Sequence, residues 1–371
     1  MFNKKLFLKL SRVQYFFWST LWLMVLVVLG TLAQNDQGLY LAQNTYFSSW
    51  FFWWGFIPLP GGTPTMGIIF FGLLSQLIFK THFSQKKLGI AITHLGAFLL
   101  LLGGLLTGLF SFEGNMVIPE GQSASYFQDY HKLELAVVNT DARDHDVTTT
   151  FDQGWFGPGK SLTHESLPFT FTILKFCANC SFERRTLTGE QKNNYVGFAQ
   201  NFSISALPLA KEDGENRAGI EFQITGSDHD GIYSVIEAMP IRQSLNAKDG
   251  RKYYIEIRHK RYNPPFTIKL FDFEKKVHAA TQQAKSYKSV VSLIDGDLTQ
   301  RAVIQMNEPL RYKGYTLYQA SFIESNDGET TVLAVVKNVG RLFPYISSII
   351  ICIGLLIHLL QNLPTLFKKM S

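Results

Sequence analysis

The stretch Ile90–Gly104, IAITHLGAFLLLLGG, is apolar apart from one histidine, His94. It lies within Leu88–Phe112, a run without Asp, Glu, Lys or Arg that is long enough to cross a bilayer core of roughly 30 Å as a helix. An ionisable side chain at membrane depth is costly, so an imidazole there must stay neutral and either form a hydrogen bond or coordinate a ligand. The sequence therefore predicts a membrane helix, and it leaves a structural and a ligand-binding role for His94 equally open.

Glycines in this helix recur every seven residues, at Gly89, Gly96 and Gly103. At about 100° per residue they form one stripe, and such stripes let a neighbouring helix approach closely. On the same wheel His94 lies about 160° from Gly96, and it shares its face with Phe98, Leu101 and Leu105. We therefore expect the glycines to contact another helix and His94 to face lipid or another subunit.

Three further apolar runs complete the helices: Tyr15–Ala33, Met66–Phe79 and Leu342–Leu363. The first follows a basic start, but it exceeds the apolar region of a cleaved signal peptide, so a retained helix is favoured. The second is short and spans only if its flanking residues lie in the interfaces. The sequence predicts three helices within residues 1–112, at about 15–33, 64–82 and 88–112, an aromatic-rich outer loop at 34–63, and a fourth helix with a short cytoplasmic tail within 341–371.

Basic residues indicate the orientation of these helices. They cluster before the first run, between the second and third, and after the fourth: Lys4, Lys5, Lys9, Arg12, Lys80, Lys86, Lys87, Lys368 and Lys369. Because positive charge stays on the cytoplasmic side, we expect both termini in the cytoplasm and residues 113–340 outside the membrane. The formal net charge of +6 is largely explained by these residues, so we expect no nucleic-acid partner.

The outer segment is rich in β-branched and aromatic residues separated by turn signals. Candidate strands are Phe169–Phe176, Gly231–Ile241, Lys252–Tyr262 and Thr330–Val336, and the turns are GPGK, EDGEN, SDHDG and NDGE. The fold class is therefore a membrane protein with four transmembrane helices and a large, mainly β extracytoplasmic domain, sandwich-like or barrel-like, between helices three and four. Because LPFTFTILKF (Leu167–Phe176) and PPFTIKLFDF (Pro264–Phe273) resemble each other, we consider two similar β-modules.

Cysteines and tryptophans give two further candidate sites. Cys177 and Cys180 form a CANC motif, which favours a local disulfide or dithiol and leaves thiol exchange with a partner as the alternative. The motif is no haem-attachment site because Ser181 follows it, and no second such pair completes a zinc site. Trp50, Trp53 and Trp54 fit an interfacial aromatic belt, or alternatively a platform for a flat apolar ligand such as a porphyrin.

His358 is a second intramembrane histidine, in the last apolar run near Cys352, which we expect to be a small apolar residue of the helix. A hydrogen bond between helices is the simplest role for a lone membrane histidine, whereas a haem iron needs an apolar wall with one imidazole. No phosphate-binding loop, nucleophile elbow, zinc-protease or dinucleotide motif is present, so no independent catalytic motif supports an enzyme.

Four segments resemble the ResB/CcsB family of System II cytochrome c biogenesis proteins. They are Gly30–Trp50, Ile92–Gly104, Pro264–Phe273 and Val303–Phe322, of which NEPLRYKGYTLYQASF is the most specific. The resemblance covers essentially the whole chain. It implies a protein of the bacterial inner membrane with a periplasmic domain. It also implies a holocytochrome c synthase complex with a multi-span ResC/CcsA-like partner. That complex carries haem to the outer face of the membrane and attaches it to apocytochrome c.

The same resemblance places an axial ligand of the haem at His94, with the second ligand from the partner. The implied cofactor is haem b, transported or shared with that partner. The external haem-ligand histidines belong to the partner, so His131, His145, His164, His229, His259 and His278 receive no role. If the CANC pair exchanges thiols, apocytochrome c or thioredoxin-like reductants are its partners.

Two other functions stay open beside haem delivery. One is a haem-free scaffold that docks apocytochrome or thiol-redox partners to the synthase. The other is an electron-transfer subunit with b-type haem, which a single secure membrane histidine makes less favoured.

Overall fold

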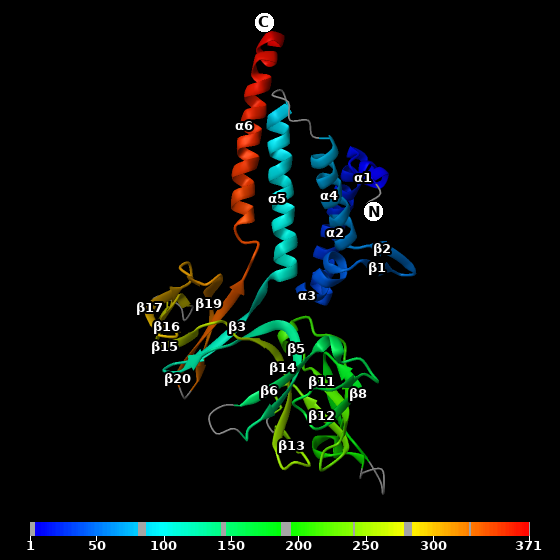
Figure 1. Ribbon diagram of the computed structural model, residues 1–371, viewed down its shortest axis with the longest axis vertical. Coiled ribbons are helices and arrows are strands. Elements are labelled where there is room, and N and C mark those ends of the chain that lie inside the picture. Colours follow the sequence, from blue (N-terminus) through cyan, green and yellow to red (C-terminus); the bar gives the residue numbers. More distant parts are fainter. Residues whose placement is uncertain are drawn as a thin grey trace. The chain divides into compact units, whose positions relative to one another are not determined.

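The computed structural model describes residues 4–80, 87–141, 146–186, 194–239, 242–277, 284–325 and 328–370 (Figure 1). The chain forms two compact units. The first comprises residues 1–112, 311–316 and 336–371, and the second comprises 113–310 and 317–335. The first unit is mainly helical, whereas the second is built from β-strands.

Four helices in the described part of the chain are long and apolar enough to cross a membrane. They span Val13–Gln37, Gly62–Lys80, Leu88–Phe110 and Phe343–Leu363, close to the four apolar runs of the sequence. The helices of the unit are α1 (Lys4–Leu10), α2 (Val13–Gln37), α3 (Leu39–Ala42), α4 (Gly62–Ser75), α5 (Leu88–Phe110) and α6 (Phe343–Met370), with π-helical η1 (Gln43–Ser48) and η2 (Gln76–Lys80). The predicted end of the second helix, at 81–82, lies outside the described residues.

The short helix α1 was not expected from the sequence. The chain leaves it through Arg12, whose backbone is extended at φ −77° and ψ 136°. The Ser11 hydroxyl donates to the carbonyl of Leu8 at 2.9 Å, which satisfies an acceptor at the helix end. The Ser75 hydroxyl of α4 donates to the carbonyl of Phe7 at 2.7 Å. These bonds hold the link between α1 and α2 beside α4.

Residues 34–63 are structured, so the predicted loop is corrected. Helix α2 continues to Gln37, and α3 and η1 lead into a hairpin of β1 (Phe51–Trp54) and β2 (Ile57–Pro60). Gly55 turns the hairpin with φ +61°, which only glycine adopts at little cost. Two short apolar runs around a two-residue turn were the signal for this hairpin.

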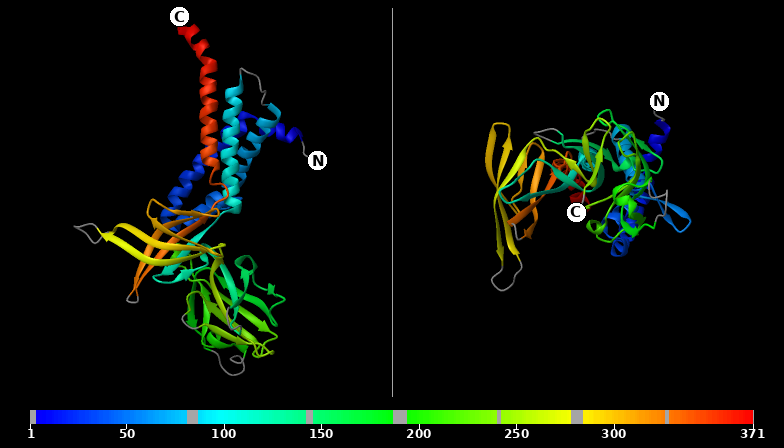
Figure 2. Two further views of the ribbon diagram at one scale, coloured as in Figure 1. Left: turned by 60° about the vertical axis from the view of Figure 1, so that its left-hand side comes forward. Right: turned by 90° about the horizontal axis from the view of Figure 1, so that it is seen from below.

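Helix α5 packs against α6 along its glycine stripe, as the wheel predicted, and the two helices run side by side in Figures 1 and 2. A Cβ atom on Gly96 would lie 2.7 Å from the side chain of Ile351. A Cβ on Gly354 of α6 would lie 2.5 Å from the Thr93 hydroxyl. Gly89 and Gly103 are likewise buried. Because these glycines carry no side chain, the backbones of α5 and α6 can approach each other closely.

The second unit contains four sheets of described strands. Their orders are β12-β11-β8-β7, β10-β9, β17-β16-β15-β4, and β13-β14-β5-β3-β20-β19-β18 with β6 paired to β5. The strands are β3 (Phe112–Pro119), β4 (Ser123–Ala124), β5 (Phe127–Asn139), β6 (Val147–Asp152), β7 (Ser161–Leu162), β8 (Thr170–Cys177), β9 (Cys180–Arg184), β10 (Phe202–Ala206), β11 (Gly219–Thr225), β12 (Gly231–Ile236), β13 (Gln243–Asn246), β14 (Lys252–Tyr262), β15 (Thr267–Val277), β16 (Ala284–Asp295), β17 (Leu298–Gln305), β18 (Leu310–Tyr312), β19 (Tyr315–Ser325) and β20 (Gly328–Lys337). The expected β-rich fold is therefore present.

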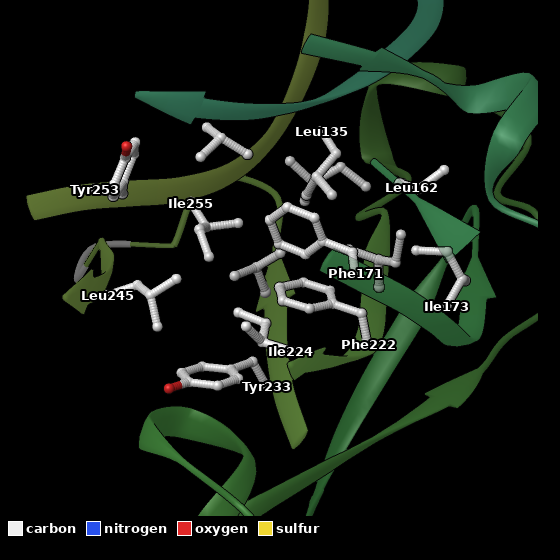
Figure 3. Packing of buried hydrophobic residues seen from close by; sticks show 14 of the residues in the cluster. Leu135, Leu162, Phe171, Ile173, Phe222, Ile224, Tyr233, Leu245, Tyr253 and Ile255 are labelled. Carbon is white, nitrogen blue, oxygen red and sulfur yellow. The ribbon is translucent and has the colours of Figure 1, made fainter. Parts of the chain in front are cut away.

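The largest hydrophobic cluster in the described residues lies between β5, β13 and β14 on one side and β7, β8, β11 and β12 on the other (Figure 3). Phe171 and Phe222 are fully buried and meet edge to face, with ring centroids 5.2 Å apart. Tyr233 stacks on Phe222 and its hydroxyl donates to the His229 carbonyl at 2.6 Å. Removing one such ring would cost about 3–5 kcal/mol.

The two similar sequence segments occupy equivalent strands, β8 and β15. Each is an inner strand of a four-stranded sheet whose edge is a two-residue strand. Leu162 pairs with Phe171 in one sheet, as Ala124 pairs with Ile268 in the other. The register then shifts on the far side of both strands, at Leu174 in β8 and at Phe271 in β15. The same edge pairing and the same bulge position support a common structural unit.

Candidate functional site

Helix α5 places His94 at a cavity of about 380 Å³ in the helical unit. We call it the His94 cavity. Its lining residues come from α1, α2, α4 and α5 and the segments that join them: Leu10, Ser11, Arg12, Val13, Phe16, Ile68, Ile69, Gly72, Leu73, Gln76, Thr93, His94 and Ala97. The volume falls in the range of small-molecule sites, about 300–1,000 Å³.

One hydrogen bond sets the tautomer of His94. Its Nδ1 lies 2.8 Å from the carbonyl oxygen of Ile90, one turn earlier in α5. A carbonyl oxygen carries no proton, so Nδ1 must be the donor. The neutral ring then keeps its lone pair on Nε2, and this is the arrangement that orients a histidine for a metal ion. The helix itself therefore prepares His94 as a neutral donor ligand.

The wall of the His94 cavity is mostly apolar, with one permanent cation at Arg12. Arg12 is exposed at the break between α1 and α2, and Gln76 is a further polar group of the lining. A guanidinium binds carboxylates through two parallel hydrogen bonds. The arrangement suits a largely apolar ligand that contains a metal centre and carries acidic groups.

Close packing near Gly72 brings α1 against α4. A Cβ on Gly72 would lie 2.9 Å from the carbonyl oxygen of Leu10. Gly67 on the same helix has no neighbour within 4 Å of such an atom. One wall of the His94 cavity therefore depends on the absence of a side chain at Gly72.

The expectation that His94 faces out of the chain is corrected. His94 does lie away from the glycine stripe, but α4 and the α1–α2 link cover that side of α5. Phe98, on the same helical face, has its ring centroid 5.1 Å from that of Phe70 in α4. A helical wheel gives the direction of a side chain, but it does not say which neighbour lies there.

His358 is not brought to His94. It lies in α6, where its backbone is packed against Gly89. The side-chain amide of Asn362 lies 3.2 Å from its ring. Among the residues that line the His94 cavity in the described structure, His94 is the only histidine. The ligand role of His358 stays a prediction, and these contacts favour a structural one.

The tryptophans lie elsewhere, in and beside the β1–β2 hairpin. Trp50, Trp53 and Trp54 are 66%, 70% and 56% exposed. None of them lines the His94 cavity. Their exposure agrees with an interfacial aromatic belt, and the porphyrin platform stays a prediction.

Cys177 and Cys180 form a disulfide between β8 and β9. They are 5% and 7% exposed and pack against Ile204 and Ile236. An attacking thiolate needs access to a sulfur atom, so burial favours the structural role over exchange with a partner. The free Cys352 is exposed on α6.

The other histidines of the described β unit contact carboxylates or lie at the surface. His131 Nδ1 is 2.5 Å from Asp213, and His259 Nε2 is 3.0 Å from Glu237. His164 and His229 are exposed. His145 and His278 lie outside the described residues.

The sequence interpretation missed Arg12, Ser11 and Gln76 as neighbours of His94. Arg12 was counted only as a topological charge. The available signal was the expected depth in the membrane. Arg12 lies just before the first apolar run on its cytoplasmic side, and His94 lies seven residues past Lys87 from that same side. Depth alone does not select which basic residue meets the imidazole.

Comparisons with known proteins give two findings. A model of the ResB-like family matches residues 83–180 and 242–333, just over half of the chain. Protein NrfI of Wolinella succinogenes is 25% identical over 301 residues, which cover 80% of this chain and 30% of NrfI. The chain thus spans about a third of the length of this curated relative. The matched segments include α5 with His94, as well as β8, β14 and β15.

Proposed function

Because the chain belongs to the ResB-like family, we propose that it is a membrane subunit of cytochrome c biogenesis that holds haem for delivery to apocytochrome c. In this proposal the four apolar helices cross the cytoplasmic membrane, with both termini inside and the β unit outside. Haem is the cargo rather than a resident cofactor of the chain.

The observation that carries the proposal is the state of His94. Its Nδ1 donates to Ile90, so Nε2 offers a lone pair to a cavity with an apolar wall. Neutral imidazole is the usual axial ligand of haem iron.

The lining of the cavity fits the rest of a haem. Apolar side chains such as Phe16, Ile69 and Leu73 suit the porphyrin faces, because flat apolar rings gain most by leaving water. The guanidinium of Arg12 suits a propionate. These residues would bind and orient the haem and exclude water from His94.

A partner supplies what the cavity lacks. His94 is the only histidine on the described lining, so a second axial ligand would come from outside this chain. We assign it to a ResC/CcsA-like membrane protein, which with this chain would attach the haem to apocytochrome c. In this proposal the haem is b-type, which means that it has no covalent bond to the chain. The CANC segment is not an attachment site, because Ser181 and not histidine follows it.

Co-purification of the chain with its membrane partner tests the proposal. Wild type should show the Soret band of a bis-imidazole b-type haem, His94→Gly should lose it, and added imidazole should restore it. Ala97→Phe should also lose it, because a phenyl ring fills the cavity. Leu100→Phe, on an exposed position of the same helix, is the matched control and should keep the band.

An unchanged haem content in both His94→Gly and Ala97→Phe would overturn the ligand role. If His94→Gly and Ala97→Phe keep the haem of the complex and still make holocytochrome, the partner holds the haem. The chain then acts as a haem-free scaffold for the synthase.

A further inference from the structure

A second cavity, of about 320 Å³, lies in the β unit. We call it the Arg261 cavity. It is found where β12 ends and β13 begins, against β14, and its lining residues are Gln128, Val235, Ile236, Glu237, Ala238, Met239, Arg242, Gln243, Ile255, Glu256, Ile257, Arg258, His259 and Arg261. Val235, Ile255 and Ile257 lie behind this lining and belong to the buried hydrophobic cluster, so the accessible wall is mainly polar.

An irregularity in β14 brings two like charges together. His259 pairs with Leu133 of β5, but Arg261 pairs with Gln128, so the register shifts between them. Bulges of this kind re-aim side chains and are common beside functional sites. Burial lowers the pKa of Arg261, and the nearby charge of Arg258 lowers it further. Holding two guanidinium groups together is unfavourable unless an anion lies between them.

Among the described residues, carboxylates pair with Arg258 but not with Arg242 or Arg261. Arg258 is bound by Glu134 at 2.9 Å and by Glu256 at 2.7 Å. Glu237 is occupied by His259. Neither Arg242 nor Arg261 forms an ion pair with a carboxylate of the described residues.

Arg261 is held in place without a polar partner. Its guanidinium stacks on the Tyr126 ring, with 4.3 Å from Cζ to the ring centroid. Its Nε is buried and has no hydrogen-bond acceptor in the described structure. A buried donor without an acceptor is unfavourable, so an acceptor that reaches this nitrogen would relieve that cost.

We propose that the Arg261 cavity binds the carboxylate of a ligand through the guanidinium groups of Arg242 and Arg261. Arg258 is already paired with Glu134 and Glu256, so Arg242 and Arg261 are the lining guanidinium groups left for an anion. A singly charged carboxylate suits them better than a phosphate dianion, which the nearby carboxylates of Glu237 and Glu256 would repel. Planar guanidinium groups also match the two oxygens of a carboxylate.

Two sources could present this carboxylate outside the membrane. One is the propionate of a porphyrin, which rests on the proposed function, and the other is an acidic side chain of a peptide. The site itself stands on its own geometry. Failure of the haem test at His94 leaves it intact, and failure at the Arg261 cavity leaves the role of His94 intact.

Binding to the full chain in detergent tests the proposal. The probes are metal-free coproporphyrin III followed by its fluorescence, its tetramethyl ester, a glutamate-rich peptide and inorganic phosphate. The variants are Arg261→Gln and Arg242→Gln, both in an Ala97→Phe background, because the phenyl ring fills the His94 cavity and keeps the metal-free probe out of it. Arg251→Gln is the matched control, because Arg251 pairs with Asp249 at the surface, away from the cavity.

We expect coproporphyrin III to bind, with its Kd about tenfold weaker in Arg261→Gln and about threefold weaker in Arg242→Gln, as loss of a charge-assisted hydrogen bond predicts. Arg251→Gln should bind as wild type and the ester should not bind. A peptide that binds where the porphyrin does not, with the same dependence on Arg261, supports the carboxylate site and identifies the peptide as its source.

Three results would overturn the proposal: a Kd unchanged in both cavity variants, equal binding of the ester, or tighter binding of phosphate. Arg242 is exposed, so its variant should fold even if Arg261→Gln does not. Circular dichroism of each variant checks the fold.

Discussion

The two cavities of this chain differ in what surrounds their functional side chains. The His94 cavity has an apolar wall and presents a neutral lone pair, while the Arg261 cavity has charged walls and presents guanidinium groups. The Nε2 lone pair of an imidazole whose Nδ1 donates a hydrogen bond can bind a metal, whereas arginine stays charged even when half-buried. The two cavities therefore suit ligands of opposite character. The His94 cavity suits an electron-pair acceptor, and the Arg261 cavity suits an anion.

The walls of the cavities are also stabilised differently, by ion pairs in the β unit and by close helix packing in the helical unit. The largest expected effect comes from the ion pairs. Glu134 is 2% exposed and binds Arg258, so Glu134→Ala leaves a buried guanidinium short of a partner. We expect the free energy of unfolding to fall by about 3–5 kcal/mol. Denaturant unfolding followed by circular dichroism measures this loss.

Glu256→Ala is the matched control, because Glu256 binds the same guanidinium but its side chain is 28% exposed. Its cost should be about 1 kcal/mol or less. Equal losses for the two variants would contradict the view that burial of Glu134 holds this wall.

The helical cavity is expected to respond next to a change of packing. Gly72→Leu inserts a side chain where α4 meets the carbonyl of Leu10, so α1 must shift. We expect a loss of about 1–3 kcal/mol and a lower thermal unfolding temperature of the detergent-solubilised chain. Gly67→Leu, on an open face of the same helix, should be neutral or stabilising. A neutral Gly72→Leu would show that α1 does not close this cavity.

The smallest expected effect distinguishes the histidines. The hydrogen bond that His259 Nε2 donates to the Glu237 carboxylate raises the pKa of His259 above 6.5, although burial opposes this shift. A raised folded-state pKa gives stability that is complete below the unfolded value and is lost as pH rises through the folded value. His259→Gln should therefore be less stable than wild type by up to about 1 kcal/mol near pH 6.

Above the folded-state pKa of His259 this difference should vanish, and unfolding measured from pH 5 to 9 would follow it. His229→Gln, at an exposed turn, is the control and should show no such dependence. A difference that grows with pH would contradict the assignment.

Much of the fold could be predicted because its signals are local. Uncharged runs located the four apolar helices, and the glycine period located the contact between α5 and α6. Alternating residues gave Lys252–Tyr262, which coincides with β14. The hairpin of β1 and β2 was missed because its aromatic residues were taken for a loop at the membrane surface.

The candidate sites were predicted less completely. His94 was selected because it is the one ionisable residue in its run, but Arg12 was not, since a basic residue before a span also fits topology alone. The Arg261 cavity had no local signal. Arg242 and Arg261 are separated by 18 other residues and are brought together only by the pairing of β13 with β14.

The sequence by itself determined the helical runs, the β character of the second unit, the glycine stripe and the choice of His94, because these depend on composition and on the periods of helix and strand. Only the tertiary structure decided what lies opposite each side chain. It placed the α1–α2 link and α4 at the His94 cavity, buried the Cys177–Cys180 disulfide, and gave Arg261 no ion pair with a carboxylate among the described residues. The reason is physical: periodicity fixes the direction in which a side chain points, whereas its neighbours depend on long-range packing of segments distant in the chain.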